Sequence, residues 1–102
     1  MNEYTFYSDP GHAWLAVPLQ EFLDSGAEVS TCSYVCTKRS MVFLEEDIDV
    51  YRFLKAKGFI IDGDGEDQIE GCKINESHSN SSSWIRRLPR ISTIIETVSM
   101  RG

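Results

Sequence analysis

Residues 4–18, which read YTFYSDPGHAWLAVP, decide the fold. The first four residues of this stretch are β-branched or aromatic, which favours a strand. Pro10-Gly11 is typical of a type II turn, because proline presets φ at the second turn position and glycine permits a positive φ at the third. Apolar residues 13–17 follow the turn. The stretch therefore predicts a β-hairpin with a Pro-Gly loop.

Two short helices are predicted outside this hairpin. Pro18 is favoured at the first helical position, and apolar residues at helical spacing follow it as far as Gly26, a natural C-terminal cap. The second helix has the same apolar spacing and ends at Gly58. Asp47 is expected to cap its N-terminus through the side chain.

The other strand candidates lie between and after these helices. Residues 28–37 have strand propensity, and residues 41–44 form a short apolar strand, so the two are predicted to pair as a second hairpin. Residues 59–61 and 68–75 are further strand candidates, separated by a loop at 62–67. The pattern predicts an α+β fold with a mostly antiparallel sheet of two hairpins and two short helices on one face.

The composition indicates a single globular domain over residues 1–102. Apolar residues make up 41% and charged residues 25%, which are ordinary values for a folded chain. No apolar run has the length of a membrane span, and the first residues lack the features of a signal peptide. The sequence therefore predicts a cytoplasmic protein whose three cysteines are reduced.

The net charge of −6 is unevenly distributed. Residues 1–76 hold 15 of the 16 acidic residues and 6 of the 10 basic residues, a net charge of −9, whereas residues 77–102 carry +3. The acidic body disfavours direct binding to nucleic acid. Its charge is also too dilute for a nucleic-acid mimic to be the leading interpretation.

The basic C-terminal part has two predicted pieces. Residues 77–83 are polar and serine-rich, which predicts a mobile loop. Residues 84–102 are predicted to form a docking segment, with apolar side chains on the core and arginines meeting the acids of 45–49 or 62–70. The alternative is that this segment reaches outward to a partner.

Four residues could supply a zinc site: Cys32, Cys36, Cys72 and His78. Cys32 and Cys36 are separated by three residues rather than the usual two, and His78 belongs to the predicted mobile loop. Cysteines that pack as small apolar side chains are the simpler interpretation. We therefore predict no metal and no other cofactor.

His12 and Asp9 on the first turn are the candidates for catalysis. A histidine beside an aspartate could act as a general base or bind a metal, as in a small hydrolase-like or metal-binding domain. No partner nucleophile is identifiable by spacing, and the common signatures of phosphate-binding loops, nucleophile elbows and zinc hydrolases are absent. The sequence favours a protein that is not an enzyme.

Two acidic runs are candidate interaction surfaces. Residues 45–49 could bind a divalent cation, decorate the start of a helix or contact a basic partner. Residues 62–66, which read DGDGE, resemble the first positions of a calcium-binding loop. Asp67 stands where that loop needs glycine, and Lys73 stands where it needs a bidentate glutamate, so a turn is predicted instead.

Residues 6–18 and 41–49 together resemble a pattern in small uncharacterised proteins of bacteriophages and mobile elements. In those proteins a Ser-Asp-Pro-Gly-His turn follows a strand, and a Leu-Glu-Glu-Asp-x-Asp block opens a helix. The Ser-Trp-Ile-Arg segment at 83–86 is similar too, and the resemblance covers residues 4–57 best. It implies an accessory protein in the bacterial cytoplasm that binds and modulates a host protein. A defence complex, of the kind that anti-CRISPR or anti-restriction proteins target, is one such partner.

A binder of this kind needs a displayed surface rather than catalytic machinery. The sequence leaves the oligomeric state open. The candidate contact residues are Glu45, Glu46, Asp47, Asp49, Asp62, Asp64, Glu66, Asp67, Arg86 and Arg87.

Overall fold

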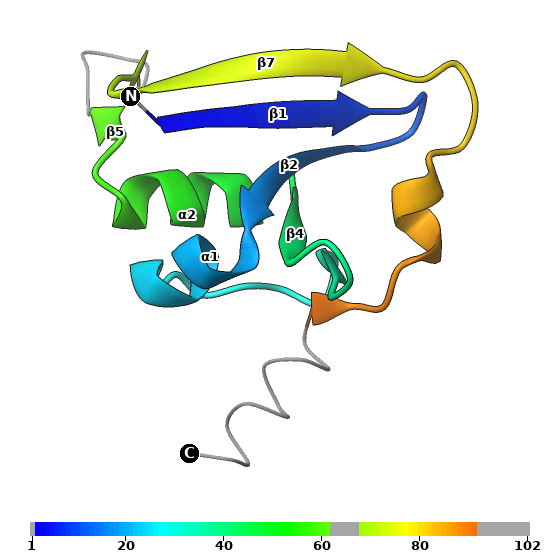
Figure 1. Ribbon diagram of the computed structural model, residues 1–102. Coiled ribbons are helices and arrows are strands. Elements are labelled where there is room, and N and C mark those ends of the chain that lie inside the picture. The colour runs from blue at the N-terminus through cyan, green and yellow to red at the C-terminus, as the bar shows by residue number, and fades with distance from the viewer. Residues whose placement is uncertain (1, 62–67, 92–102) are drawn as a thin grey trace, which may run out of the picture.

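The structure is a computed structural model that describes residues 2–61 and 68–91. Within them, a five-stranded sheet carries two short helices on one face (Figure 1). This arrangement confirms the predicted α+β class. Three of the four strand pairings are antiparallel, and the fourth is parallel, so the sheet is mixed.

Strands β1 (Asn2–Ser8) and β2 (Ala13–Pro18) form the predicted first hairpin. The side chains of residues 13–17 are all buried, because β2 is the central strand of the sheet and is covered on both faces. Strand alternation divides them between two cores. Leu15 and Val17 pack on the helix side, and Trp14 and Ala16 pack on the opposite side.

The loop of this hairpin is organised by the side chain of Asp9. Its Oδ1 accepts hydrogen bonds from the backbone N–H groups of Gly11 (3.0 Å) and His12 (2.9 Å). Gly11 does not have a positive φ, so the predicted type II turn is wrong. A Cβ on Gly11 would lie 2.8 Å from Nη2 of Arg86. Glycine is needed here because another side chain approaches closely.

Strands β3 (Tyr34–Cys36) and β4 (Met41–Glu45) form the second hairpin, and β4 also pairs with β2. Residues 28–33 were included in the predicted strand but are not part of it. The physical reason is that Ser30 and Ser33 bind the carboxylate of Asp49 instead of a neighbouring strand.

Helices α1 (Leu19–Ser25) and α2 (Asp49–Ala56) cover one face of the sheet. Gly26 and Gly58 follow them with positive φ values of 72° and 80°, as their predicted role in ending the helices requires. The buried apolar side chains of the two helices, Phe22, Phe53 and Leu54, belong to the core that contains Leu15. No helix in the described part of the chain is long and apolar enough to cross a membrane.

The start of α2 differs from the prediction. Ile48 is the residue that precedes the helix, and no side chain caps it. Asp47 is not the cap, because its backbone N–H donates to Oε2 of Glu45 at 3.0 Å and holds it in the preceding turn.

Strand β7 (Cys72–His78) is parallel to β1 along its whole length and forms one edge of the sheet. Strands β5 (Ile60–Ile61) and β6 (Gln68–Ile69) pair separately. The single strand predicted at 68–75 is therefore divided, at Gly71, whose φ is 91°. Strand β7 also extends two residues into the predicted loop at 77–83.

Residues 84–91 lie against the body of the domain. The short 3₁₀ helix η1 (Trp84–Arg87) buries Ile85 on the face opposite the helices, and Ile91 joins the helix-side core. Residues 92–102 lie outside the described residues. Two backbone hydrogen bonds of 2.9 Å cover the outer edge of β3: Val35 N–H to Pro89 O, and Ile91 N–H to Ser33 O.

Candidate functional site

A cavity of about 270 Å³, here called the Glu45 cavity, is formed beside η1 by residues of separate segments. Strand pairing creates its base, because Trp14 on β2 is the register partner of Glu45 on β4. Alternation along β4 places Glu45 on the same face as Phe43, opposite the helices. The wall consists of His12, Trp14, Cys32, Tyr34, Glu45, Asp47, Arg86 and Arg90.

Glu45 is the unusual group in this cavity. Glu45 is only 7% exposed, and its Oε2 accepts one hydrogen bond, from the backbone N–H of Asp47. Burial raises the pKa of Glu45, and the negative charges of Asp47 and Asp49 raise it further. Among residues 2–61 and 68–91, no lysine or arginine forms an ion pair with Glu45.

Asp49 has a structural role and is not a contact residue. It is 1% exposed, and its carboxylate accepts hydrogen bonds from the backbone N–H and hydroxyl of Ser30 and from the hydroxyl of Ser33. The Ser33 hydroxyl in turn accepts the backbone N–H of Glu45 at 2.9 Å. This network fixes the end of β4, and it removes Asp49 from the predicted contact surface.

Asp9 is also committed to the fold. It accepts Nε and Nη2 of Arg86 at 2.6 and 2.8 Å, in a bidentate ion pair, and the backbone N–H of Ser83 at 2.9 Å. These bonds and those from the hairpin loop hold its pKa well below the usual range, with Arg86 as the largest cause. Both oxygens of Asp9 are occupied by Arg86 and by backbone N–H groups, and within the described residues no hydrogen bond joins this carboxylate to the imidazole of His12.

The predicted partners of Arg86 were the acids of 45–49 or 62–70. The structure pairs Arg86 with Asp9 instead, and the Arg86 guanidinium lies 5.6 Å from the ring centre of Trp14. Arg90 lies 4.6 Å from the ring centre of Tyr34 and donates to the carbonyl of Thr31 at 2.9 Å. Both arginines on the cavity wall therefore already have partners.

The two aromatic side chains on the wall form one surface. The rings of Trp14 and Tyr34 meet edge to face, with centroids 6.2 Å apart, and His12 lies 6.1 Å from Trp14. Tyr34 and Arg90 were absent from the predicted site. Strand alternation in the sequence could have indicated this surface, because it places Trp14 on the same face of the sheet as Glu45.

The four candidate zinc ligands are spread over the molecule. Cys36 lies on β3 and Cys72 on β7, the two opposite edge strands of the sheet. Cys32 lines the Glu45 cavity, and Nδ1 of His78 is hydrogen-bonded to the hydroxyl of Ser8. The structure does not bring the four together.

The acidic patch could offer oxygen ligands to a hard cation. Carboxylate oxygens of Glu45, Glu46 and Asp47 lie within 4.8 Å of one another, with Glu46 and Asp47 exposed. The same oxygens suit an ammonium or guanidinium group equally well. Of the other predicted contact residues, Asp62, Asp64, Glu66 and Asp67 lie outside the described residues, and Arg87 lines a second cavity.

Comparison of the chain with protein-family models, with curated proteins and with solved structures finds no match.

Proposed function

We propose that this protein is a non-enzymatic accessory protein of a bacteriophage or mobile element that binds and modulates a host protein. The proposed target is a component of a host defence complex, and the proposed contact surface is the Glu45 cavity. The sequence pattern of residues 4–57 supports the biological setting. The cavity supports the mode of binding.

The observation that carries the proposal is the buried carboxylate of Glu45, which has no cationic partner among the described residues. A buried charge is costly unless it is paired. Neighbouring Asp47 and Asp49 add to that cost, as the raised pKa of Glu45 indicates. A lysine or arginine of the partner would neutralise the site on binding, so formation of the complex removes a destabilising feature of the free protein.

The shape and composition of the cavity suit a long basic side chain. A volume of about 270 Å³ leaves room for one side chain rather than for a folded element. Trp14 and Tyr34 border the cavity and supply apolar contact for the aliphatic stem of the side chain, while their rings already carry the guanidinium groups of Arg86 and Arg90. Asp47 at the exposed rim can attract the cation before it enters.

The test begins with the full chain as bait in a lysate of a plausible bacterial host, at low and high salt. The captured protein is identified by mass spectrometry and purified, and its affinity is measured by calorimetry. Glu45→Gln should weaken binding at least about tenfold, because removing one member of a buried charge pair is costly. Glu28→Gln removes an equal charge from an exposed residue outside the cavity and should bind like the wild type.

Three results contradict the proposal. One is the capture of no stoichiometric host protein. The second is an equal affinity of the Glu45→Gln and Glu28→Gln variants. The third is a host protein in which no single lysine or arginine replacement reproduces the loss seen with Glu45→Gln.

A further inference from the structure

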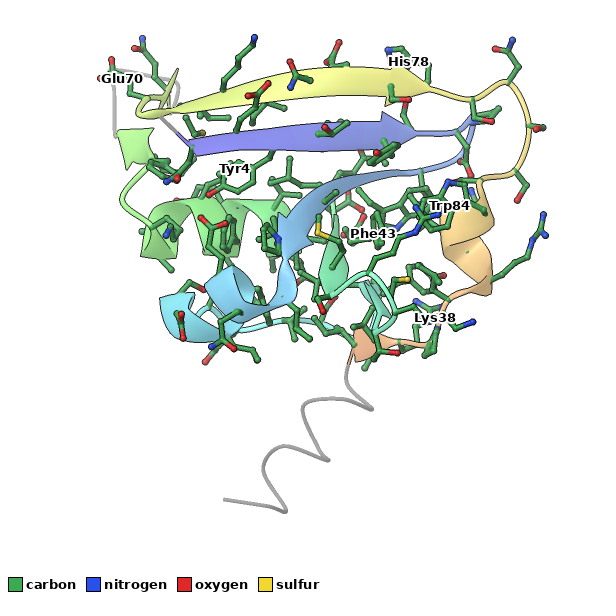
Figure 2. All side chains as sticks on the ribbon, in the orientation of Figure 1. Tyr4, Lys38, Phe43, Glu70, His78 and Trp84 are labelled. Atoms are coloured by element: carbon green, nitrogen blue, oxygen red, sulfur yellow. The ribbon has the colours of Figure 1, made fainter. Side chains whose placement is uncertain are left out.

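A second cavity, here called the Arg87 cavity, has a volume of about 320 Å³. It is formed where β1 and β7 end side by side, by the loop after β7 and by η1. Adjacent arginines of η1 serve different cavities, since Arg86 lines the Glu45 cavity and Arg87 lines this one. Figure 2 shows His78 and Trp84, which belong to its wall, at the same end of the molecule.

The polar groups on this wall are all able to donate hydrogen bonds. They are five serine hydroxyls, the phenol of Tyr7, the imidazole of His78 and the guanidinium of Arg87. Two of the hydroxyls already have partners, since Ser8 is hydrogen-bonded to His78 and Ser79 donates to the carbonyl of Ser81, which leaves those of Ser77, Ser82 and Ser83 for a ligand. Within the described residues no carboxylate lines the cavity, although the protein carries a net charge of −6. A concave site with many donors, one cation and no acid is suited to an anion with several acceptor oxygens.

Arg87 provides the charge for such a ligand. It is exposed and, among the described residues, it forms no ion pair, whereas neighbouring Arg86 is held by Asp9. The planar donor fork of arginine matches the geometry of phosphate oxygens and can bind two of them at once. Nothing in the described structure competes with a ligand for this guanidinium.

His78 also belongs to the wall of the Arg87 cavity, and its ring is held in place. The hydroxyl of Ser8 is hydrogen-bonded to Nδ1, and with the hydroxyl as donor the ring proton lies on Nε2, where it can be donated. Among the described residues, the acid that forms an ion pair with His78 is Glu76, with Oε2 at 4.0 Å from Nε2, which is beyond hydrogen-bond length. The Glu76 side chain is exposed and is not part of the wall.

One side of the cavity is aromatic. Trp84 is 39% exposed and is fixed by edge contacts with Tyr7 and Phe43, at centroid distances of 6.5 and 5.2 Å. The guanidinium of Arg39 lies over this ring, 5.1 Å from its centre, and the remaining exposed part of the indole offers an apolar surface beside the donors. A phosphate ester could place its organic group there while its phosphate meets Arg87.

We propose that the Arg87 cavity binds a phosphate group, either free or carried by an ester. Arg87, His78 and the serine hydroxyls contact the oxygens, and Trp84 contacts the organic group of an ester. This inference does not depend on the proposed function, because it concerns a different cavity and a ligand of the opposite charge.

The test is an NMR titration of the full chain with inorganic phosphate, against sodium chloride of matched ionic strength. Each of the two tryptophans has its own indole N–H signal, so the two cavities can be followed separately. Trp84 lines the Arg87 cavity, and Trp14, which is 2% exposed, lines the other one. A second titration uses phenyl phosphate, and the tighter of the two ligands shows whether the site prefers free phosphate or an ester.

The variants are Arg87→Gln and Lys55→Gln, which remove the same charge. Lys55 is exposed on α2 and lies outside the cavity. We expect saturable movement of the Trp84 signal in the wild type and in Lys55→Gln, and binding at least about tenfold weaker in Arg87→Gln. The proposal is wrong if neither compound gives a saturable shift, if Trp14 moves in place of Trp84, or if the two variants bind equally.

Discussion

Asp9 and Glu45 lie at the same end of the sheet, and both carboxylates are largely buried, but their surroundings are opposite. Asp9 accepts three backbone N–H groups and a bidentate arginine. Glu45 accepts one backbone N–H and faces two further acids. The pKa of Asp9 is therefore lowered, and the pKa of Glu45 is raised.

The difference separates a buried acid that stabilises the fold from one that weakens it. The bonds to Asp9 join the first hairpin to η1, 77 positions away along the chain. Glu45 makes no comparable connection, and its burial is unfavourable in the free protein. On the proposal made above, a cationic side chain of the partner would offset this cost on binding.

The largest effect is expected for Asp9→Asn, which should lower the melting temperature by several degrees at pH 7. The change removes the negative charge beside Arg86 and weakens three backbone hydrogen bonds, from Gly11, His12 and Ser83. Because the pKa of Asp9 is lowered in the folded state, its contribution is complete above the unfolded value of about 4 and is lost as the pH falls. The difference between the melting temperatures of the two proteins should narrow as the pH falls from about 4 to 2. A constant difference would mean that the charge of Asp9 is not what matters.

A smaller effect is expected for Gly11→Ala, which should cost about 1 kcal/mol of unfolding free energy. The added Cβ would lie 2.8 Å from Nη2 of Arg86 and push the guanidinium away from Asp9. In an Arg86→Lys background the same substitution should cost little, and a double-mutant cycle measured by urea denaturation would show the coupling. Equal costs in the two backgrounds would contradict the close approach of Arg86 to the loop.

The smallest effect on stability, and of the opposite sign, is expected for Glu45→Gln. This variant should melt slightly above the wild type at pH 7, because it removes a charge whose burial is unfavourable. A raised carboxyl pKa means that the folded protein gains stability as the pH falls through that pKa, so the advantage of the variant should shrink on mild acidification. Calorimetry at pH 7 and pH 5 measures this change. Glu28→Gln, at an exposed residue outside the cavity, is the control and should leave the melting temperature unchanged.

The sequence was sufficient for the fold class because the decisive signals are local. The apolar stretch after Pro10-Gly11 and the glycines at 26 and 58 specify a hairpin and two helix ends within a few residues. The parallel pairing of β7 with β1 was not predictable, because it joins segments about 70 positions apart and no local pattern records it. The predicted strand at 28–37 begins too early because of another contact between distant residues. Ser30 and Ser33 bind Asp49 on α2, so residues 28–33 are not part of β3.

The site was predictable only in part. The acidic segment that contains Glu45 was recognised, but the pattern gave equal weight to Asp49, which is buried within the fold. The sequence does not show whether an acidic residue has a cationic partner. Only tertiary contacts distinguish Asp9, which pairs with distant Arg86, from Glu45, which has no such partner among the described residues. Tyr34 and Arg90 were missed because they meet only where the C-terminal segment crosses the edge of β3.

The placement of residues 72–91 has a consequence for how the protein is made. Strand β7 pairs with β1 at the very start of the chain, and Ile85 and Ile91 fill the cores on the two faces of the sheet. Both cores stay incomplete until these residues have left the ribosome. The two cores therefore cannot be completed before residue 91 has emerged, and a nascent chain that stalls before residue 85 exposes apolar surface to chaperones and proteases.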